Sequence, residues 1–145
     1  MSGLTEALLL VNLASTLFMV GVIWFVQIVH YPLFSRVGTP GFVAYEDDHS
    51  RLTGYVVGPP MLLEAATALA LLTFRPTGVP ASLLWVGFGL VVVIWASTAL
   101  LQIPRHTALG TGFDERAHRF LVASNWVRTI AWTLRGALVL GIISI

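Results

Sequence analysis

Four long apolar stretches, separated by short polar segments, make up most of this 145-residue sequence. They cover residues 4–29, 55–74, 81–103 and 120–145. Each meets the length of about 20 residues that an α-helix needs to cross the hydrocarbon core of a bilayer. Inside lipid every backbone polar group needs a partner within the protein, and a helix provides one within each segment. We therefore predict an all-α fold, an integral membrane four-helix bundle.

The charge content of the chain supports the same prediction. Only 10% of the residues are charged and 57% are hydrophobic, whereas a soluble domain carries about 25% charged residues to keep its surface hydrated. We therefore treat residues 1–145 as a single domain embedded in a lipid bilayer. The net charge of +1 indicates no surface for nucleic acid. The sequence has no cysteine, which excludes disulfides and thiolate ligands.

Arginine placement predicts the orientation of the bundle. Five of the eight arginines lie in the segments that join the first span to the second and the third to the fourth: Arg36, Arg51, Arg105, Arg116 and Arg119. The opposite side carries Arg75 alone. Because cytoplasmic loops are enriched in positive charge, we expect these two segments in the cytoplasm and both termini outside.

The two halves of the sequence have a similar layout. One span ends in Gln-Ile-Val-His at residues 27–30, and another ends in Gln-Ile-Pro-Arg-His at residues 102–106. The next span is preceded by Glu-x-x-His in each half, at residues 46–49 and 115–118. We predict two pseudo-repeated helical hairpins, and this topology brings all four histidines to one membrane face.

Carboxylates and imidazoles in this layout are typical of a metal site. The two side chains of Glu-x-x-His share one face of a helix. Four-helix dimetal proteins use two such pairs and one ligand from each of the other helices. The candidate ligands are His30, Glu46, His49, His106, Glu115 and His118. They suit one or two transition-metal ions, such as iron, copper, zinc or manganese. Haem between paired histidines is a further option. An interfacial role without metal is another, because acidic residues are also favoured at a helix start.

Charged residues also occur inside the predicted spans, where they are expected to face the bundle interior. Glu64 and Arg128 each lie about two turns into their spans, at similar depth from the same membrane face. We expect them either to form a structural ion pair or to line a pocket that orients a polar substrate group. Arg135 lies deeper and has no evident acidic partner.

Tryptophan and tyrosine are mostly expected as anchors at the membrane interfaces. These anchors would be Trp24, Trp85, Trp126, Tyr31, Tyr45 and Tyr55. Trp95 and Trp132 lie deeper, and we expect them to pack in the bundle or to form the walls of an aromatic pocket.

The second span is expected to be disturbed near its start. Gly58, Pro59 and Pro60 follow one another there, and each proline removes a backbone donor. Such a break beside a polar cluster either lines a cavity or sets a kink.

Two motifs of the second half resemble the anthrone-oxygenase-like family, small four-span membrane proteins that are mostly bacterial. They are Gln102-Ile103-Pro104-Arg105-His106 and Asn125-Trp126-Val127-Arg128-Thr129. The family pattern is roughly Asn-Val-Pro-x-Asn, then Asn-His-Val-Arg-Thr at the opening of the last helix. The exit from the first span, Tyr31-Pro32-Leu33, and the prolines at 59 and 60 are also similar to that family.

The resemblance implies site residues and a reaction. Gln102, Asn125 and Arg128 would be site residues, and the activity would be oxygenation of an activated aromatic ring carbon. A bacterial inner membrane would be the location. This sequence departs from the family pattern at His106 and Trp126, and the carboxylate–histidine pairs are not part of that pattern.

Three kinds of function are compatible with these patterns. The first is a membrane oxidoreductase or oxygenase that acts on a small lipophilic aromatic or quinone-like molecule. Its catalytic candidates are Glu64, Gln102, Asn125 and Arg128, with Trp95 and Trp132 bordering the cofactor or substrate. The second is a non-enzymatic subunit or assembly factor of a larger membrane complex. The third is a transporter working through Glu64 and Arg128, which would need a homo-oligomer to enclose a path. The first is the working hypothesis.

Overall fold

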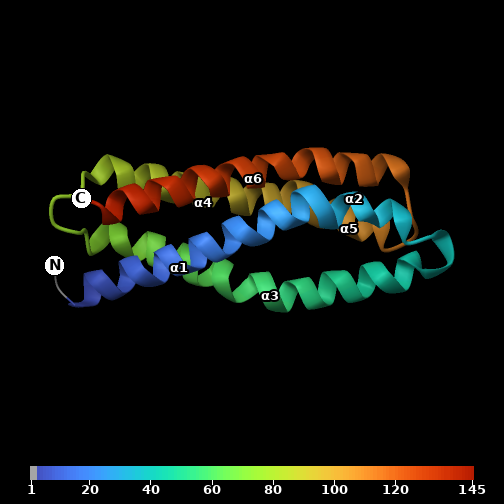
Figure 1. Ribbon diagram of the computed structural model, residues 1–145, viewed down its shortest axis with the longest axis horizontal. Helices are drawn as coiled ribbons and strands as arrows, with labels where there is room; N and C mark the ends of the chain where they lie inside the picture. The colour runs from blue at the N-terminus through green and yellow to red at the C-terminus, as the bar shows by residue number, and fades with distance from the viewer. Residues whose placement is uncertain (1–2) are drawn as a thin grey trace.

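The protein is an all-α bundle of four helical rods that lie side by side (Figure 1). The computed structural model describes residues 3–145, and within that range the backbone forms helices and turns with no strand. The first rod consists of α1 (Gly3–Phe25), η1 (Val26–His30), α2 (Tyr31–Leu33) and η2 (Phe34–Arg36). The second is α3 (Thr39–Thr73). The third is α4 (Ala81–Ser97), η3 (Thr98–Gln102) and α5 (Ile103–Leu109), and the fourth is α6 (Glu115–Ile143).

All four rods are long and apolar enough to cross a membrane, which is compatible with an integral membrane protein. They contain 34, 35, 29 and 29 residues, so they are about 44–52 Å long at 1.5 Å per residue. The predicted spans lie almost entirely within them, but the helices are longer. α3 begins sixteen residues before the predicted residue 55. The rods therefore exceed the bilayer core of about 30 Å, and the helical parts outside the predicted spans carry the histidines.

The packing order of the helices places the first and third rods at opposite corners. α1 packs against α3 and α6, and α4 packs against the same two helices. The start of α1, the end of α6 and the α3–α4 connection share one end of the bundle (Figure 1). The α5–α6 and η2–α3 connections share the other end, where the histidines lie, as the predicted hairpin topology requires.

Apolar packing fills the bundle interior, while many large apolar side chains remain on its outside. Met19, Ile23, Phe34, Ile94 and Trp132 are each 0% exposed and belong to the main core. Leucine, valine, isoleucine and phenylalanine side chains are exposed along all four rods. A soluble protein rarely exposes apolar patches of that extent, and lipid is the solvent that suits them.

A proline follows the π-helical turn in each half of the chain. η1 and η3 are each five residues long, and Pro32 and Pro104 lie in the first two positions of the helices that follow. Proline has no N–H and its ring clashes with the carbonyl four residues earlier. A π-turn widens the helix at that point and re-aims the side chains after it. The matched turns support the predicted pseudo-repeat.

The prolines in α3 lie inside the helix and do not end it, so they do not break the second rod. Pro59 and Pro60 lie inside one continuous α-helix from Thr39 to Thr73. Two backbone donors are missing there, yet the helix continues through both prolines.

Candidate functional site

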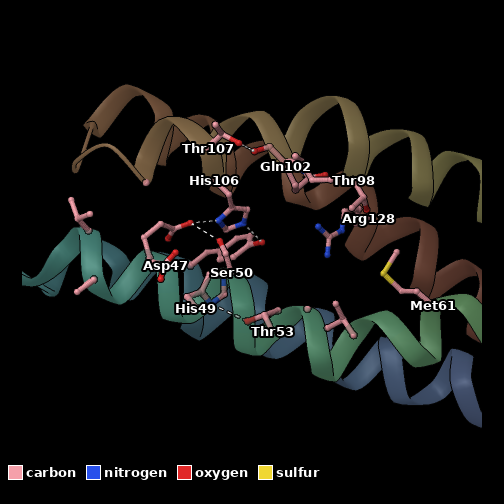
Figure 2. Close-up of a pocket in the computed structure, with 18 of the residues that line it drawn as sticks. Asp47, His49, Ser50, Thr53, Met61, Thr98, Gln102, His106, Thr107 and Arg128 are labelled. Carbon is pink, nitrogen blue, oxygen red and sulfur yellow. Dashed lines mark hydrogen bonds and ion pairs between the residues drawn. The ribbon is translucent and has the colours of Figure 1, made fainter.

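A cleft of about 880 Å³ opens between the first half of α3 and the segment formed by η3 and α5 (Figure 2). Its α3 wall carries Glu46, His49, Thr53, Val57 and Met61. Its opposite wall carries Thr98, Gln102 and His106, and Tyr31 and Arg128 also border it. The lining therefore combines ionisable groups with apolar ones, and the volume lies within the range of about 300–1,000 Å³ that is usual for small-molecule sites.

A chain of hydrogen bonds joins Tyr31, His106 and Glu46 along this cleft. The Tyr31 hydroxyl lies 2.9 Å from Nε2 of His106. Nδ1 of the same ring lies 2.5 Å from Oε1 of Glu46. Glu46 is 1% exposed, and its second oxygen, Oε2, is buried without a hydrogen-bond partner. The imidazole is thus held at both nitrogens, one by a phenol and one by a carboxylate.

A second pair of imidazoles lies beside this chain. Nε2 of His30 lies 2.8 Å from Nδ1 of His49, and the Thr53 hydroxyl lies 3.0 Å from the same His49 nitrogen. The rings of His49 and His106 are 5.2 Å apart between centroids. Three of the four histidines therefore form one cluster, as the predicted topology requires.

The fourth histidine lies on the other side of a phenylalanine. The fully buried ring of Phe34 lies within 6.3 Å of all four imidazoles, measured between ring centroids. His118 stacks on it and hydrogen-bonds through Nε2 to the backbone carbonyl of Tyr31 at 2.8 Å. That bond holds the start of α6 against α2. His118 thus supports the site from behind and does not line the cleft.

The two Glu-x-x-His pairs are not equivalent, and the expectation that Glu115 joins the cluster is wrong. Its carboxylate pairs with Arg119 at 3.2 Å, and both side chains are more than 70% exposed. The reason is the position of each glutamate in its helix. Glu115 is the first residue of α6, where Asp114 already caps the helix through the Ala117 amide. Glu46 lies a further two turns into α3 and faces the bundle.

As placed, these side chains do not match a metal-binding arrangement. In residues 3–145 no group of three or more histidines, aspartates and glutamates is arranged to hold a metal ion. His30 and His49 face each other's ring nitrogens, and His106 is held by Glu46. We therefore derive no chemical step through a metal, and the predicted metal site stays a prediction.

The buried Glu64 pairs with Arg135, which was predicted to have no acidic partner, so the ion pair of Glu64 with Arg128, one of two predicted alternatives, does not form. Nε of Arg135 lies 2.7 Å from Oε1 of Glu64, and the side chains are 2% and 1% exposed. Seven residues separate the two arginines, so both face the same side of α6. Glu64 and Arg135 lie nine and eight residues before their helices end, and this matching depth decides the partner.

The ion pair belongs to a polar network that joins all four rods. Glu64 also accepts hydrogen bonds from Thr16 at Oε1 and from Trp132 at Oε2. Arg135 donates to the Gly87 carbonyl and to the Asn12 side chain. Each carboxylate oxygen and each guanidinium nitrogen therefore has a partner. A fully satisfied buried network of this kind holds helices in register.

The remaining candidates lie in different surroundings. Gln102 lines the cleft and bonds to Ser97 and Ser124. Asn125 is fully buried and donates to Gln27 of η1, away from the residues that line the cleft.

The two deep tryptophans differ as well. Trp132 is fully buried in the network, whereas Trp95 is 38% exposed on the outer face of α4. Together they do not form the walls of one aromatic pocket, because Trp132 lies in the buried core and Trp95 lies on the exposed surface of α4.

Two site residues had no predicted role in the site. Tyr31 was expected as an interfacial anchor, yet its side chain is 4% exposed and joins His106 to Arg128. Thr53 was not among the candidates, yet it contacts His49 and lines the cleft. The spacing of Thr53 four residues after His49 was visible in the sequence. The contact between Tyr31 and His106, 75 residues apart, was not.

Comparisons of this chain with protein-family models, with curated proteins and with solved structures find no match.

Proposed function

We propose that the protein is a membrane-embedded oxidoreductase that deprotonates a small lipophilic aromatic or quinone-like molecule and so prepares it for oxygenation. The observation that carries this proposal is the hydrogen-bonded run from Tyr31 through His106 to Glu46, on the wall of a cleft of about 880 Å³. The cleft supplies room for a bicyclic or tricyclic ring system, and the run supplies a base beside it.

The arrangement around His106 suits general base catalysis. In the tautomer in which Nδ1 donates to Glu46, Nε2 accepts a hydrogen bond from the Tyr31 hydroxyl. A substrate proton passes to the phenol oxygen of Tyr31 while the phenol proton passes to Nε2. The Glu46 carboxylate fixes the ring and stabilises the imidazolium that forms. A base placed in this way accelerates proton transfer by about 10²–10⁴-fold.

The resemblance to the anthrone-oxygenase-like family supplies the class of reaction. Loss of a proton from a ring CH₂ that is conjugated with a carbonyl through the flanking aromatic rings gives an electron-rich carbanion, whose charge extends to the carbonyl oxygen. That carbanion reduces dioxygen, and the balanced outcome converts CH₂ and O₂ into C=O and H₂O. Gln102, which lines the cleft, and Arg128, at its inner end, are two of the three residues that this resemblance implies.

The arginines support the proposed orientation in the membrane. Arg36, Arg51, Arg105, Arg116 and Arg119 belong to the end of the bundle that holds the histidines, and Arg75 belongs to the other. By the preference of cytoplasmic segments for positive charge, the cleft faces the cytoplasm and both termini lie outside. A bacterial inner membrane is the location that fits this orientation and the family resemblance.

The test uses the purified protein in phosphatidylcholine nanodiscs with anthrone and dioxygen. We expect oxygen uptake with formation of anthraquinone above the spontaneous rate. Glu46→Gln should lower the enzymatic rate by about 10²-fold or more, because the imidazole loses the carboxylate that stabilises its charged form. Glu115→Gln is the matched control from the other Glu-x-x-His pair, and it should keep the wild-type rate. Equal rates for wild type, Glu46→Gln and empty nanodiscs would refute the proposal for this substrate class.

A further inference from the structure

Arg128 occupies an unusual position in the bundle. It lies thirteen residues after the start of α6 and fifteen before its end, about 20 Å from either end at 1.5 Å per residue. Its side chain is 7% exposed. A charge buried at mid-membrane depth is costly and is normally paired or in contact with a water-filled space.

No carboxylate balances this charge among the described residues. The ion pairs within residues 3–145 leave Arg128 out, and its Nε is buried without a hydrogen-bond partner. Its described contacts are with two uncharged groups, the Tyr31 hydroxyl and the Trp132 ring, whose centroid is 5.3 Å from the guanidinium carbon. Arg135, about two helical turns further along the same side of α6, has a partner at every nitrogen.

The guanidinium points into the cleft. Figure 2 shows its nitrogens directed into the space between α3 and η3, at the inner end of the lining residues. Thr98 and Gln102 lie on one side of that space and Met61 on the other. The inner end therefore offers a bidentate donor of hydrogen bonds next to an apolar wall that includes Val57.

We propose that Arg128 is the anchor of an oxyanion subsite, and that the cleft takes an aromatic amphiphile whose carboxylate or phenolate oxygen binds there. The planar guanidinium fork matches two acceptor oxygens. The ring system of the ligand lies against Val57 and Met61. This inference deepens the proposed function, since it names the ligand class of the same cleft.

The subsite also connects with the proton relay. Tyr31 contacts both Arg128 and His106. An oxygen held by Arg128 therefore lies next to the phenol that begins the relay. Negative charge that develops on the ligand after proton loss would be stabilised at Arg128, while the proton moves toward Glu46. One arginine thus accounts for both binding and charge stabilisation.

The experiment compares two probes of the same shape, 2-naphthoate and the neutral 2-naphthamide, by calorimetric titration into wild-type protein in phosphatidylcholine nanodiscs. We expect naphthoate to bind more tightly than naphthamide. Arg128→Gln should weaken naphthoate binding about tenfold or more, as the loss of a charge-assisted hydrogen bond does, and should leave naphthamide nearly unchanged. Arg128→Lys should keep part of the preference. Arg119→Gln, at an exposed position outside the cleft, should keep all of it.

Several results would overturn the oxyanion subsite or the ligand class proposed for it. Equal affinity of the wild type for the two probes overturns the subsite, and so does an unchanged preference in Arg128→Gln. If that variant fails to fold, the wild-type preference and the Arg128→Lys variant decide. The titration is repeated in nanodiscs that contain phosphatidylglycerol. If this anionic lipid displaces naphthoate, a lipid phosphate is the anion that Arg128 binds, and the proposal of a small aromatic ligand is wrong. The titration measures binding without turnover. The protein can therefore fail the oxygenation assay and still show the binding preference, so the two proposals are tested separately.

Discussion

Nδ1 of His106 lies 2.5 Å from Oε1 of Glu46, although 60 residues separate them in the chain. The contact joins α5 to α3 across the mouth of a cleft whose inner end is formed by Arg128. A base with its orienting carboxylate and an unpaired cation thus border one space. That combination underlies the proposed proton transfer and the proposed oxyanion subsite.

Tyr31→Phe should remove the group that passes the substrate proton to His106. The variant removes the hydroxyl that lies 2.9 Å from Nε2 of His106, while the apolar ring that packs against Phe34 remains. We expect the rate of oxygen uptake with anthrone to fall about 10²-fold, within the range for loss of a proton-transfer group. Tyr55→Phe is the control, because Tyr55 is 70% exposed on α3. Equal rates for Tyr31→Phe and wild type would show that the Tyr31 hydroxyl takes no part in the proton transfer.

Glu64→Gln should destabilise the fold strongly. Removing one partner of a buried ion pair leaves the other charge unpaired and costs about 3–5 kcal/mol, and Arg135 is 2% exposed. The free energy of unfolding, measured by detergent titration, should fall accordingly. Asp48→Asn breaks an ion pair whose side chains are 53% and 62% exposed, and unfolding should not change measurably. A Glu64→Gln variant as stable as wild type would mean that Arg135 has another anion.

Trp132→Phe should lower the free energy of unfolding more than Trp95→Phe, although both replace an indole by a smaller phenyl ring. Trp132 donates Nε1 to Oε2 of Glu64 at 2.9 Å, and an unmet buried acceptor costs about 1–3 kcal/mol. Trp95 is 38% exposed, and a surface substitution usually stays within about 0.5 kcal/mol. Thermal unfolding in detergent measures both. A larger loss for Trp95→Phe would indicate that this face of α4 is covered by another subunit.

Chelator treatment tests the predicted metal site at the four of its six candidate ligands that border the cleft or lie beside it, His30, Glu46, His49 and His106. These side chains are hydrogen-bonded to one another in two pairs, so we expect the rate of oxygen uptake to survive dialysis against EDTA. Elemental analysis of the same sample before and after dialysis is the second measurement. A stoichiometric metal that leaves together with the activity, and is missing from His49→Ala, would instead support the predicted site.

Much of the fold follows from local properties of the sequence. Length and apolar content predict four helices across a membrane, and the described helices match them in number and order. The hairpin layout predicts that the histidines share one end, which is confirmed. These inferences hold because hydropathy acts on each segment separately and because consecutive spans alternate in direction.

The partners within the bundle were decided by tertiary structure alone. Sequence spacing could not tell Arg128 from Arg135 as the partner of Glu64, nor Glu46 from Glu115 as the acid of the site. Each pairing depends on how far one helix is rotated and shifted along its neighbour. The π-turns before Pro32 and Pro104 change that rotation within a helix. Hydropathy places a residue in a membrane, but only the packed helices determine which side chain it meets.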